Sequence, residues 1–166
     1  MNIVALAGGV GGAKLAHGLM LTPTLALARQ IGSGNLTIIV NTGDDFELYG
    51  LHISPDLDTV TYTLAGLANP DTGWGLAGDT FQFLDALKQL GFEAWFGLGD
   101  RDLATHVRRT DLLRQGQTLT DATQLITRSL NIVPTILPMT DNRFRTILNT
   151  DQGRLEFQEY FVHRQW

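Results

Sequence analysis

The chain has 166 residues, of which 43% are hydrophobic and 17% charged, a balance typical of a globular domain rather than a disordered chain. Its formal net charge is −5 and it has no cluster of four or more basic residues, so we do not expect nucleic acid as its main ligand. It contains no cysteine, which excludes disulfides, a thiolate nucleophile and zinc–cysteine sites.

The same composition bears on location and domain number. Absence of cysteine fits the cytoplasm, and the first residues carry no basic leader pattern. No apolar run approaches the roughly 20 residues of a membrane span, so no membrane association is expected. We therefore expect one cytoplasmic domain over residues 1–166.

The first predicted unit is a strand, a glycine-rich turn and a helix. The apolar run from Asn2 to Ala7 is typical of a buried parallel strand, and the helix that follows carries Leu15 and Leu19 four residues apart. Four of the five residues between them are glycines, namely Gly8, Gly9, Gly11 and Gly12. Such a turn lets the backbone approach a phosphate, which the first amides of the helix then face. The spelling matches neither the P-loop nor the dinucleotide motif, so a tight turn with only packing duties stays open.

The second predicted strand ends in an acidic loop. Pro23 predicts the start of a helical segment from Thr24 to Ile31, and Leu36 to Val40 is a strand rich in β-branched residues. The strand leads into Asn41-Thr-Gly-Asp-Asp45. Because loops at the carboxyl ends of parallel strands share one sheet edge, this loop should lie beside the glycine turn. Two adjacent acids suit Mg²⁺ bound together with substrate phosphates, whereas a hydrated Asx turn is the plainer alternative.

The middle of the chain alternates helices and loops. Ser54 as N-cap and Pro55 at the first helical position predict a helix through Ala65. Asp56 and Asp58 lie in its first turn, where interaction with the helix dipole alone could explain both acids. A second helix is expected from Asp79-Thr80 to Gly91.

A third acidic loop is expected after a short strand. Glu93 to Phe96 predicts that strand, and Asp100 is a good N-cap for a helix to about Leu113. Arg101 lies between two acids, so we expect it to be paired while keeping donors for an anion. A surface ion-pair network is the alternative. A third acidic loop after a strand strengthens the case that Asp58 belongs to a site.

The last third of the chain completes the fold prediction. Thr120-Asp121 caps a helix to Leu130, and Ile132 to Leu137 is a strand at an edge or bend because of Pro134. Arg145 to Thr150 and Arg154 to Val162 form an antiparallel hairpin. These elements predict an α/β, Rossmann-like, three-layer α/β/α fold with a mainly parallel sheet and a C-terminal antiparallel hairpin. No metal-spaced histidine pair and no G-x-S-x-G motif occur.

An ordered set of motifs closely resembles the 2-phospho-L-lactate transferase family of coenzyme F-420 biosynthesis. The set comprises Gly8 to Lys14, Asn41 to Asp45, Ser54 to Val60, Gly78 to Phe81, Leu98 to Asp102, Ala104 to His106, Arg109, Pro138 to Asp141, and Phe157-Gln158. The resemblance covers essentially the whole chain. Members of this family are roughly double this length, so the chain resembles a truncated, N-terminal portion of them.

The resemblance implies a function and a site. The family moves a phospholactyl or phosphoenolpyruvyl unit from a guanosine-diphosphate-linked donor to the ribityl hydroxyl of 7,8-didemethyl-8-hydroxy-5-deazariboflavin, with Mg²⁺ and with release of GMP. Matching positions imply catalytic roles for Asp58, Asp45 and Arg101, with Asp45 and Asp58 as metal ligands and Asp58 and Arg101 near the deazaflavin. Donor phosphates would lie against Gly8, Gly9, Gly11 and Gly12, with Lys14 and Asn41 as further contacts.

Two other functions remain as alternatives. A non-enzymatic nucleotide-sugar-binding regulator of the gluconeogenesis-factor type shares the glycine loop and an Asp-Asp loop, but Ser54 to Asp58 and Asp100 to Asp102 favour the transferase. A nicotinamide oxidoreductase is disfavoured, because Asp44 lies much farther beyond the glycines than the roughly 20 residues of a ribose-binding acid. An incomplete sheet is expected to recruit a partner, and a homo-oligomer is one such outcome.

Overall fold

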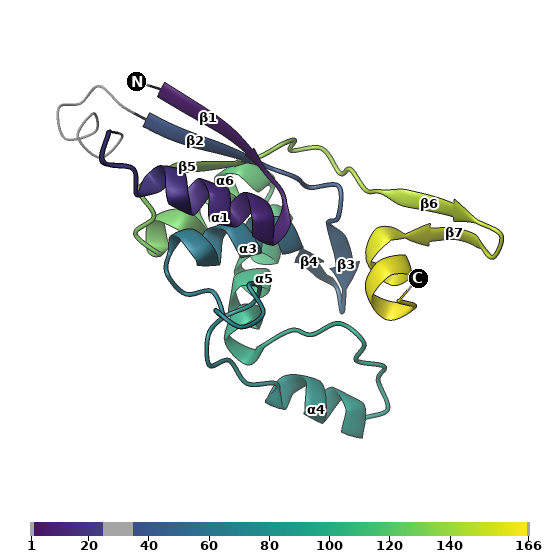
Figure 1. Cartoon of the computed structure of the whole chain (residues 1–166). Coiled ribbons are helices and arrows are strands. Elements are labelled where there is room, and N and C mark those ends of the chain that lie inside the picture. The colour runs from purple at the N-terminus through teal and green to yellow at the C-terminus, as the bar shows by residue number, and fades with distance from the viewer. Residues whose placement is uncertain (1, 25–34, 166) are drawn as a thin grey trace.

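The chain forms a mixed α/β structure around a three-stranded parallel sheet (Figure 1). A computed structural model describes residues 2–24 and 35–165; most of the helical segment expected from Thr24 to Ile31 lies outside them. The sheet consists of β1 (Asn2–Ala7), β2 (Asn35–Val40) and β5 (Thr135–Pro138), in the order β1-β2-β5. Both pairings are parallel, which confirms the parallel sheet of the sequence prediction.

Helices pack against one face of this sheet. These are α1 (Gly9–Met20), α3 (Pro55–Leu64) and α6 (Leu119–Ser129). Their apolar residues join one face of the strands in a single core, made of Ala5, Ala13, Ala16, Leu36, Ile38, Val40, Leu57, Val60, Leu64, Leu119 and Ile136. Each fully buried Leu, Ile or Val contributes about 1.5–3 kcal/mol relative to an exposed one.

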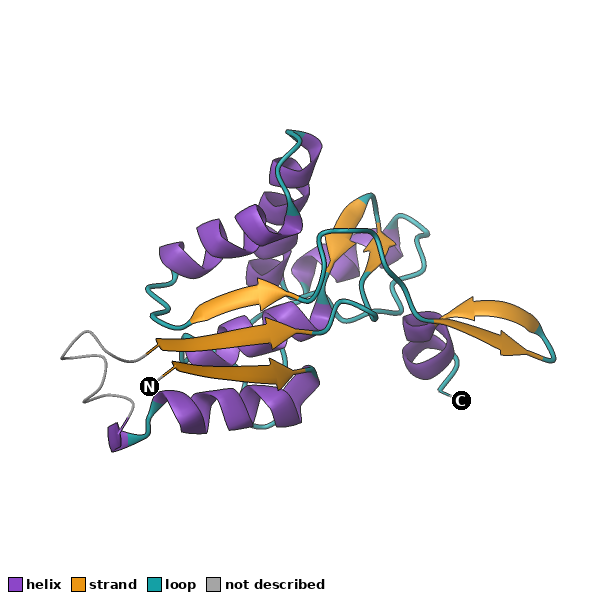
Figure 2. Ribbon diagram, turned by 90° about the horizontal axis from the view of Figure 1, so that it is seen from above, coloured by secondary structure: helices purple, strands orange, loops and turns teal. Residues whose placement is uncertain are grey.

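The other face of the sheet carries no helix in the described part of the chain (Figure 2). The prediction of a fully buried first strand was therefore wrong for this face. Val4 and Leu6 of β1 are 63% and 75% exposed, whereas Ala5 between them is buried. Because successive side chains of a strand point to opposite faces, only the alternate residues of β1 reach the core.

A second, smaller core lies beside the sheet. It joins the hairpin β3 (Phe46–Leu48) and β4 (Leu51–Ile53) to α4 (Gln82–Gln89) through Phe46, Ile53, Leu84 and Leu98. The sequence analysis did not predict this hairpin, because three-residue strands are too short to show alternation. Its two-residue turn, Tyr49-Gly50, has positive φ at both positions (53° and 73°), as a type I′ turn requires.

The strand predicted from Glu93 to Phe96 is not formed. Trp95 and Phe96 instead pack their rings against Phe46, with centroids 5.9 and 4.9 Å away, and the Glu93 carbonyl accepts a hydrogen bond from the Tyr49 hydroxyl. Aromatic packing and the hydrogen bond from Tyr49 hold this segment in place without a strand ladder.

Helix starts also differ from prediction around α5 (Asp100–Arg114), which packs against α6 and β4. The helix expected at Asp79-Thr80 begins at Gln82, and Asp100 lies in the first turn of its helix rather than at the N-cap. The last predicted helix is capped by Thr118, which forms a capping box with Asp121.

The chain ends in a hairpin that projects from the body and a short helix (Figure 1). The predicted hairpin is confirmed as β6 (Ile147–Thr150) and β7 (Gly153–Glu156). The second strand stops well before Val162, and a π-helix over Glu159–His163 follows. Stacking of the His163 ring on Trp95, at 5.0 Å and 10°, fixes this helix to the body. Among the described helices, none combines the length and apolarity needed to cross a membrane.

Candidate functional site

The glycine turn leads directly into α1. Gly8 is the N-cap, with extended backbone, and the other three glycines lie in the helix itself. A side chain at Gly12 would meet the backbone of Ala7, since an added Cβ would lie 2.8 Å from the Ala7 Cα. Gly12 is thus required for close packing of helix on strand, whereas Gly11 faces open space. Gly9 has a φ of 58°, a left-handed conformation that favours glycine, and a Cβ at Gly8 would lie 3.1 Å from the Asp56 Oδ2. Local geometry thus accounts for three of the four glycines, and the phosphate role of the turn stays a prediction.

A carboxylate from the chain itself lies at the N-terminus of α1. Asp56, from the first turn of α3, accepts hydrogen bonds from the Gly9 amide and from the Asn41 Nδ2, the latter at 2.9 Å. Burial raises the pKa of Asp56 although these hydrogen bonds oppose the shift. Burial, Asp56 and Asp45 likewise raise the pKa of Asp44. Negative charge is therefore concentrated beside the glycine turn, where the helix dipole favours an anion.

Asp45 is buried at the end of the acidic loop. Its Oδ2 accepts hydrogen bonds from the Ser54 hydroxyl at 2.8 Å and is 3.0 Å from the His52 Nε2. Ser54 occupies the predicted N-cap position of α3, but its hydroxyl binds Asp45 instead of capping the helix. The Asp45 Oδ1 is also buried and has no hydrogen-bond partner among the described residues. One oxygen of Asp45 is thus free to bind a cation or a donor.

Asp58 forms a buried ion pair with Arg109 of α5. The two guanidinium nitrogens of Arg109 contact the two carboxylate oxygens, with NH1 3.1 Å from Oδ2. Arg109 and Asp58 are only 2% and 6% exposed. Burial raises the pKa of Asp58, while the positive charges of Arg109 and His106 act in the opposite direction. A bidentate pair of this kind fixes the orientation of the Asp58 carboxylate.

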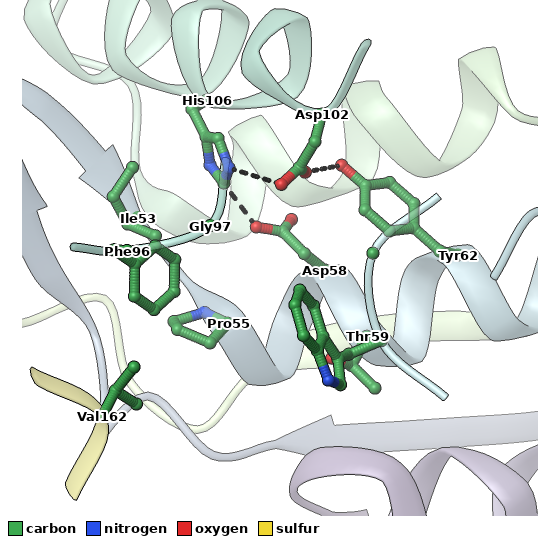
Figure 3. Close-up of a pocket in the computed structure, with 12 residues that line it drawn as sticks. Ile53, Pro55, Asp58, Thr59, Tyr62, Phe96, Gly97, Asp102, His106 and Val162 are labelled. Carbon is green, nitrogen blue, oxygen red and sulfur yellow. Dashed lines mark hydrogen bonds and ion pairs between the residues drawn. The ribbon is translucent and has the colours of Figure 1, made fainter. Parts of the chain in front are cut away.

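Asp102 lies next to this pair and is held from two sides. The Tyr62 hydroxyl donates to its Oδ1 at 2.6 Å, and the His106 Nε2 is 3.2 Å from its Oδ2 (Figure 3). Burial would raise the pKa of Asp102, but its interactions with His106, Tyr62 and Arg109 hold it below the usual value. Burial, Asp58 and Asp102 raise the pKa of Tyr62, so the hydroxyl remains a donor. Ligand atoms of Asp58, Asp102 and His106 lie within 4.8 Å of one another.

These polar groups form one end of a cavity of about 300 Å³. Apolar and aromatic groups form the rest, and Figure 3 shows Phe96, Pro55 and Val162 on the side away from His106. The lining residues are Ile53, Pro55, Asp58, Thr59, Tyr62, Trp74, Gly75, Phe96, Gly97, Asp102, His106 and Val162. Most drug-sized ligands bind in such cavities, with apolar walls and a few oriented polar groups.

The structure brings together only some of the predicted site residues. Asp58 lines this cavity, whereas Asp45 lines a neighbouring one of about 190 Å³. Asn41 lies at the glycine turn through its bond to Asp56, and Lys14 is exposed on α1. Arg101 is also exposed, and its NH1 donates to the Ala77 carbonyl at 3.2 Å instead of pairing with the adjacent acids.

Sequence reasoning assigned no role to the residues that hold Asp58 in place. Asp102, His106 and Arg109 recur at spacings of four and three along α5, which places them on one face of that helix. Tyr62 lies four residues beyond Asp58 on α3. The helical spacing was therefore visible in the sequence, but the crossing of α3 and α5 that joins the two faces was not.

Comparison with known proteins gives consistent matches. A family model described as 2-phospho-L-lactate transferase CofD matches residues 3–165. The chain is 42% identical over 167 residues to a phosphoenolpyruvate transferase of Streptomyces avermitilis, covering 98% of this chain and 50% of that protein. It is 41% identical to a 2-phospho-L-lactate transferase of Methanospirillum hungatei, covering 96% and 51% respectively. The chain thus spans about half the length of these curated relatives.

A solved structure shares the fold. The crystal structure of a UPF0052-family protein from Bacillus halodurans matches with a TM-score of 0.51 and 17% sequence identity. The match covers 96% of this chain and 46% of that chain.

Proposed function

The chain belongs to the 2-phospho-L-lactate transferase family, and we propose that it carries the acceptor-binding part of such an enzyme. The proposed reaction transfers a 2-phospholactyl or enolpyruvyl phosphate group from a guanosine-diphosphate-linked donor to a deazaflavin acceptor, with release of GMP, in coenzyme F-420 biosynthesis. Relatives named as phosphoenolpyruvate transferase and as 2-phospho-L-lactate transferase match this chain at similar identity, so the proposal includes both donors.

The observation that carries this proposal is the cavity with aromatic walls and a charged end. A flat deazaflavin ring suits the walls formed by Phe96 and Trp74, because aromatic rings stack and bury much area. Its hydroxyl-bearing chain would then reach Asp58 and Asp102. The two carboxylates are positioned in advance by Arg109 and Tyr62.

Attack of a hydroxyl on phosphorus depends on alignment and charge neutralisation more than on a covalent nucleophile. Interactions with His106 and Tyr62 hold the pKa of Asp102 low, so its carboxylate stays ionised. It can then accept a hydrogen bond from the hydroxyl of the deazaflavin. Asp58 is a second acceptor, fixed by Arg109. Arg101 is proposed to contact the deazaflavin at the edge of the cavity, since its exposed side chain is not part of the cavity lining.

Donor phosphates are proposed to lie against Gly8, Gly9 and Gly11, within reach of Lys14 and Asn41. The Asp56 carboxylate occupies part of this helix N-terminus, so phosphate binding must displace it or share a cation with it. An anion already bound there by the chain itself supports the view that the turn binds anions.

Mg²⁺ is proposed as the cofactor, held by Asp45 and Asp58. The buried, unpartnered Asp45 Oδ1 fits a hard cation. Asp58 fits only if it gives up a contact to Arg109, because both of its oxygens are engaged. Bound there, the ion would neutralise charge on the transferred phosphoryl group.

The transferase is preferred over the nucleotide-sugar-binding regulator. Relatives above 40% identity carry transferase names, whereas the UPF0052 structure, at 17% identity, shares the fold alone. A co-purified deazaflavin would count against the regulator.

The acceptor site is tested by measuring the binding of deazaflavin to this chain through the change in deazaflavin fluorescence. Gly97→Leu adds bulk to the cavity wall beside Trp74, because an added Cβ would lie 3.7 Å from that ring. Gly97 is not among the glycines with positive φ, so its backbone conformation accepts a side chain. We expect it to weaken binding at least about tenfold, while Ala86→Leu on the exposed side of α4 leaves binding unchanged. Equal binding by both variants would refute the assignment of the cavity. Mass spectrometry of the chain with Mg²⁺, guanylated donor and deazaflavin then tests for product.

A further inference from the structure

A second cavity, of about 280 Å³, lies next to the proposed acceptor cavity. The residues that line both cavities are Trp74, Gly75, Gly97 and Asp102. The two glycines contribute no side chain, and Asp102 is held in place by Tyr62 and His106. Of the four shared residues, Trp74 is therefore the one whose large side chain stands between the cavities.

The backbone at Trp74 is fixed by the loop that carries it. Gly73 and Gly75, on either side, have positive φ (76° and 70°), which glycine adopts without steric cost. The Thr72 hydroxyl donates to the Trp74 carbonyl at 2.7 Å and accepts from the Trp74 amide at 3.4 Å. The Gly75 carbonyl accepts a hydrogen bond from the Asn69 amide at 3.0 Å. The point from which the indole projects is thus set before any ligand binds.

The indole ring of Trp74 has more freedom than its backbone. Its side chain is half exposed, and no other aromatic ring in residues 2–24 and 35–165 packs against it. Trp95 differs, because its ring stacks on His163 and also packs against Phe46. A large ring that faces two cavities and packs on no other ring offers its surface to a ligand.

The acceptor cavity is small for the ligand proposed to occupy it. About 300 Å³ is the lower limit of the usual range for ligand cavities, and a deazaflavin has three fused rings and a hydroxylated chain. Asp102 lines both cavities, so a ligand whose chain is held there lies close to the second one. A larger ring system needs that second space, and the Trp74 indole stands in its way.

We propose that Trp74 determines which ring systems the acceptor cavity admits, an inference that rests on the proposed acceptor site. The indole stacks on the flat deazaflavin ring and, in that position, keeps the second cavity apart from the ligand. Riboflavin carries two ring methyl groups that the deazaflavin lacks. To make room for them the indole must move, and the stack is lost. Trp74 thus favours the deazaflavin both by contact and by exclusion of larger rings.

The proposal is tested by measuring the affinities of this chain for the deazaflavin and for riboflavin through ligand fluorescence. We expect the unmodified chain to prefer the deazaflavin. Trp74→Ala joins the two cavities, so it should lower this preference at least about tenfold, because the deazaflavin loses its stack and riboflavin gains room. Phe92→Ala is a matched control and should leave the preference unchanged, since Phe92 is 58% exposed and lines neither cavity.

Thermal unfolding checks that each variant is folded. If Trp74→Ala does not fold, Trp74→Phe keeps a smaller ring at the same place and should lower the preference several-fold. Unchanged preference in a folded Trp74 variant overturns the role of Trp74 and leaves the acceptor site standing, as does equal binding of both compounds by the unmodified chain. Binding of neither compound by the unmodified chain refutes the acceptor site itself, and the role of Trp74 with it. None of these readouts depends on transferase activity.

Discussion

At the scale of single residues, the pairing of Asp58 with Arg109 governs how the site can be studied. Asp58→Asn keeps the size of the side chain and removes only its charge. Both side chains are buried, however, and each is the main charge partner of the other. Removing one partner of such a pair leaves an uncompensated charge in the protein interior.

We therefore predict that Asp58→Asn destabilises the protein by about 3–5 kcal/mol, measured by urea unfolding. Asp111→Asn is the control on α5, the helix that carries Arg109, because the ion pair of Asp111 with Arg108, at 3.1 Å, is solvent-exposed and should contribute under about 1 kcal/mol. Similar losses in both variants would show that the buried pair contributes no special stability. Loss of activity in Asp58→Asn is interpretable only beside this measurement.

A second residue-scale prediction separates two glycines of the turn. Gly12→Ala should destabilise by about 1–3 kcal/mol, because its Cβ would lie 2.8 Å from the Ala7 Cα. Gly11→Ala should stabilise by about 0.5–1 kcal/mol, since no heavy atom lies within 4 Å and alanine favours the helix. Equilibrium unfolding of the two variants tests both signs. Equal effects would contradict the packing role of Gly12.

At the scale of elements, two helices exchange their caps. Asp79, before α4, accepts hydrogen bonds from the first amides of α5, at Arg101 (2.9 Å) and Asp102 (3.0 Å). Asp100, in α5, accepts from the first amides of α4, at Gln82 (3.0 Å) and Phe83 (2.9 Å). Hydrogen bonds from Thr80, Phe83 and Gln82 also lower the pKa of Asp100. This exchange ties the start of α5, and hence Asp102, to the loop before α4.

We predict that Asp79→Ala costs about 1–2 kcal/mol, because it leaves amides at the start of α5 without a partner. The measurement is the thermal unfolding midpoint. Asp85→Ala provides the control, since this acid is exposed and its ion pair with Lys88, at 3.7 Å, lies in solvent. If the two variants unfold at the same temperature, Asp79 is not the effective cap of α5.

At the scale of the whole molecule, the C-terminal helix closes part of the cavity. Val162 lines the cavity, and the adjacent His163 stacks on Trp95 and lies 2.9 Å from the Glu93 carboxylate. The helix has five residues, Glu159–His163, and none of them is buried. Segments with little buried area open most readily.

We predict that His163→Ala speeds proteolytic cleavage of the C-terminal segment several-fold while the main unfolding transition changes by less than about 0.5 kcal/mol. Limited proteolysis with mass spectrometry measures the cleavage rate. Arg154→Ala, on the exposed part of β7, should cleave like the unmodified chain. Identical rates in all three would show that the ring stack does not hold the segment.

Much of the fold could be predicted because it depends on local patterns. The strand at Asn2–Ala7, the helix start at Ser54-Pro55 and the C-terminal hairpin follow from apolar runs, caps and turn residues. The prediction at Glu93 to Phe96 was wrong because aromatic residues with high strand propensity pack as a cluster when no partner strand is present. Strand propensity reports how well a side chain fits a half-buried surface, and that surface can belong to an aromatic cluster as well as to a strand.

The sequence by itself determined the family and the parallel α/β architecture, and it predicted the glycine turn, Asp45 and Asp58 as site residues. Those follow from residue types and their spacing along the chain. Only the tertiary structure decided that Asp58 pairs with Arg109, that Asp56 lies at the start of α1, and that one sheet face carries no helix from the described residues. The physical reason is that these features join segments far apart in sequence, where partners are set by packing of helices and strands rather than by local pattern.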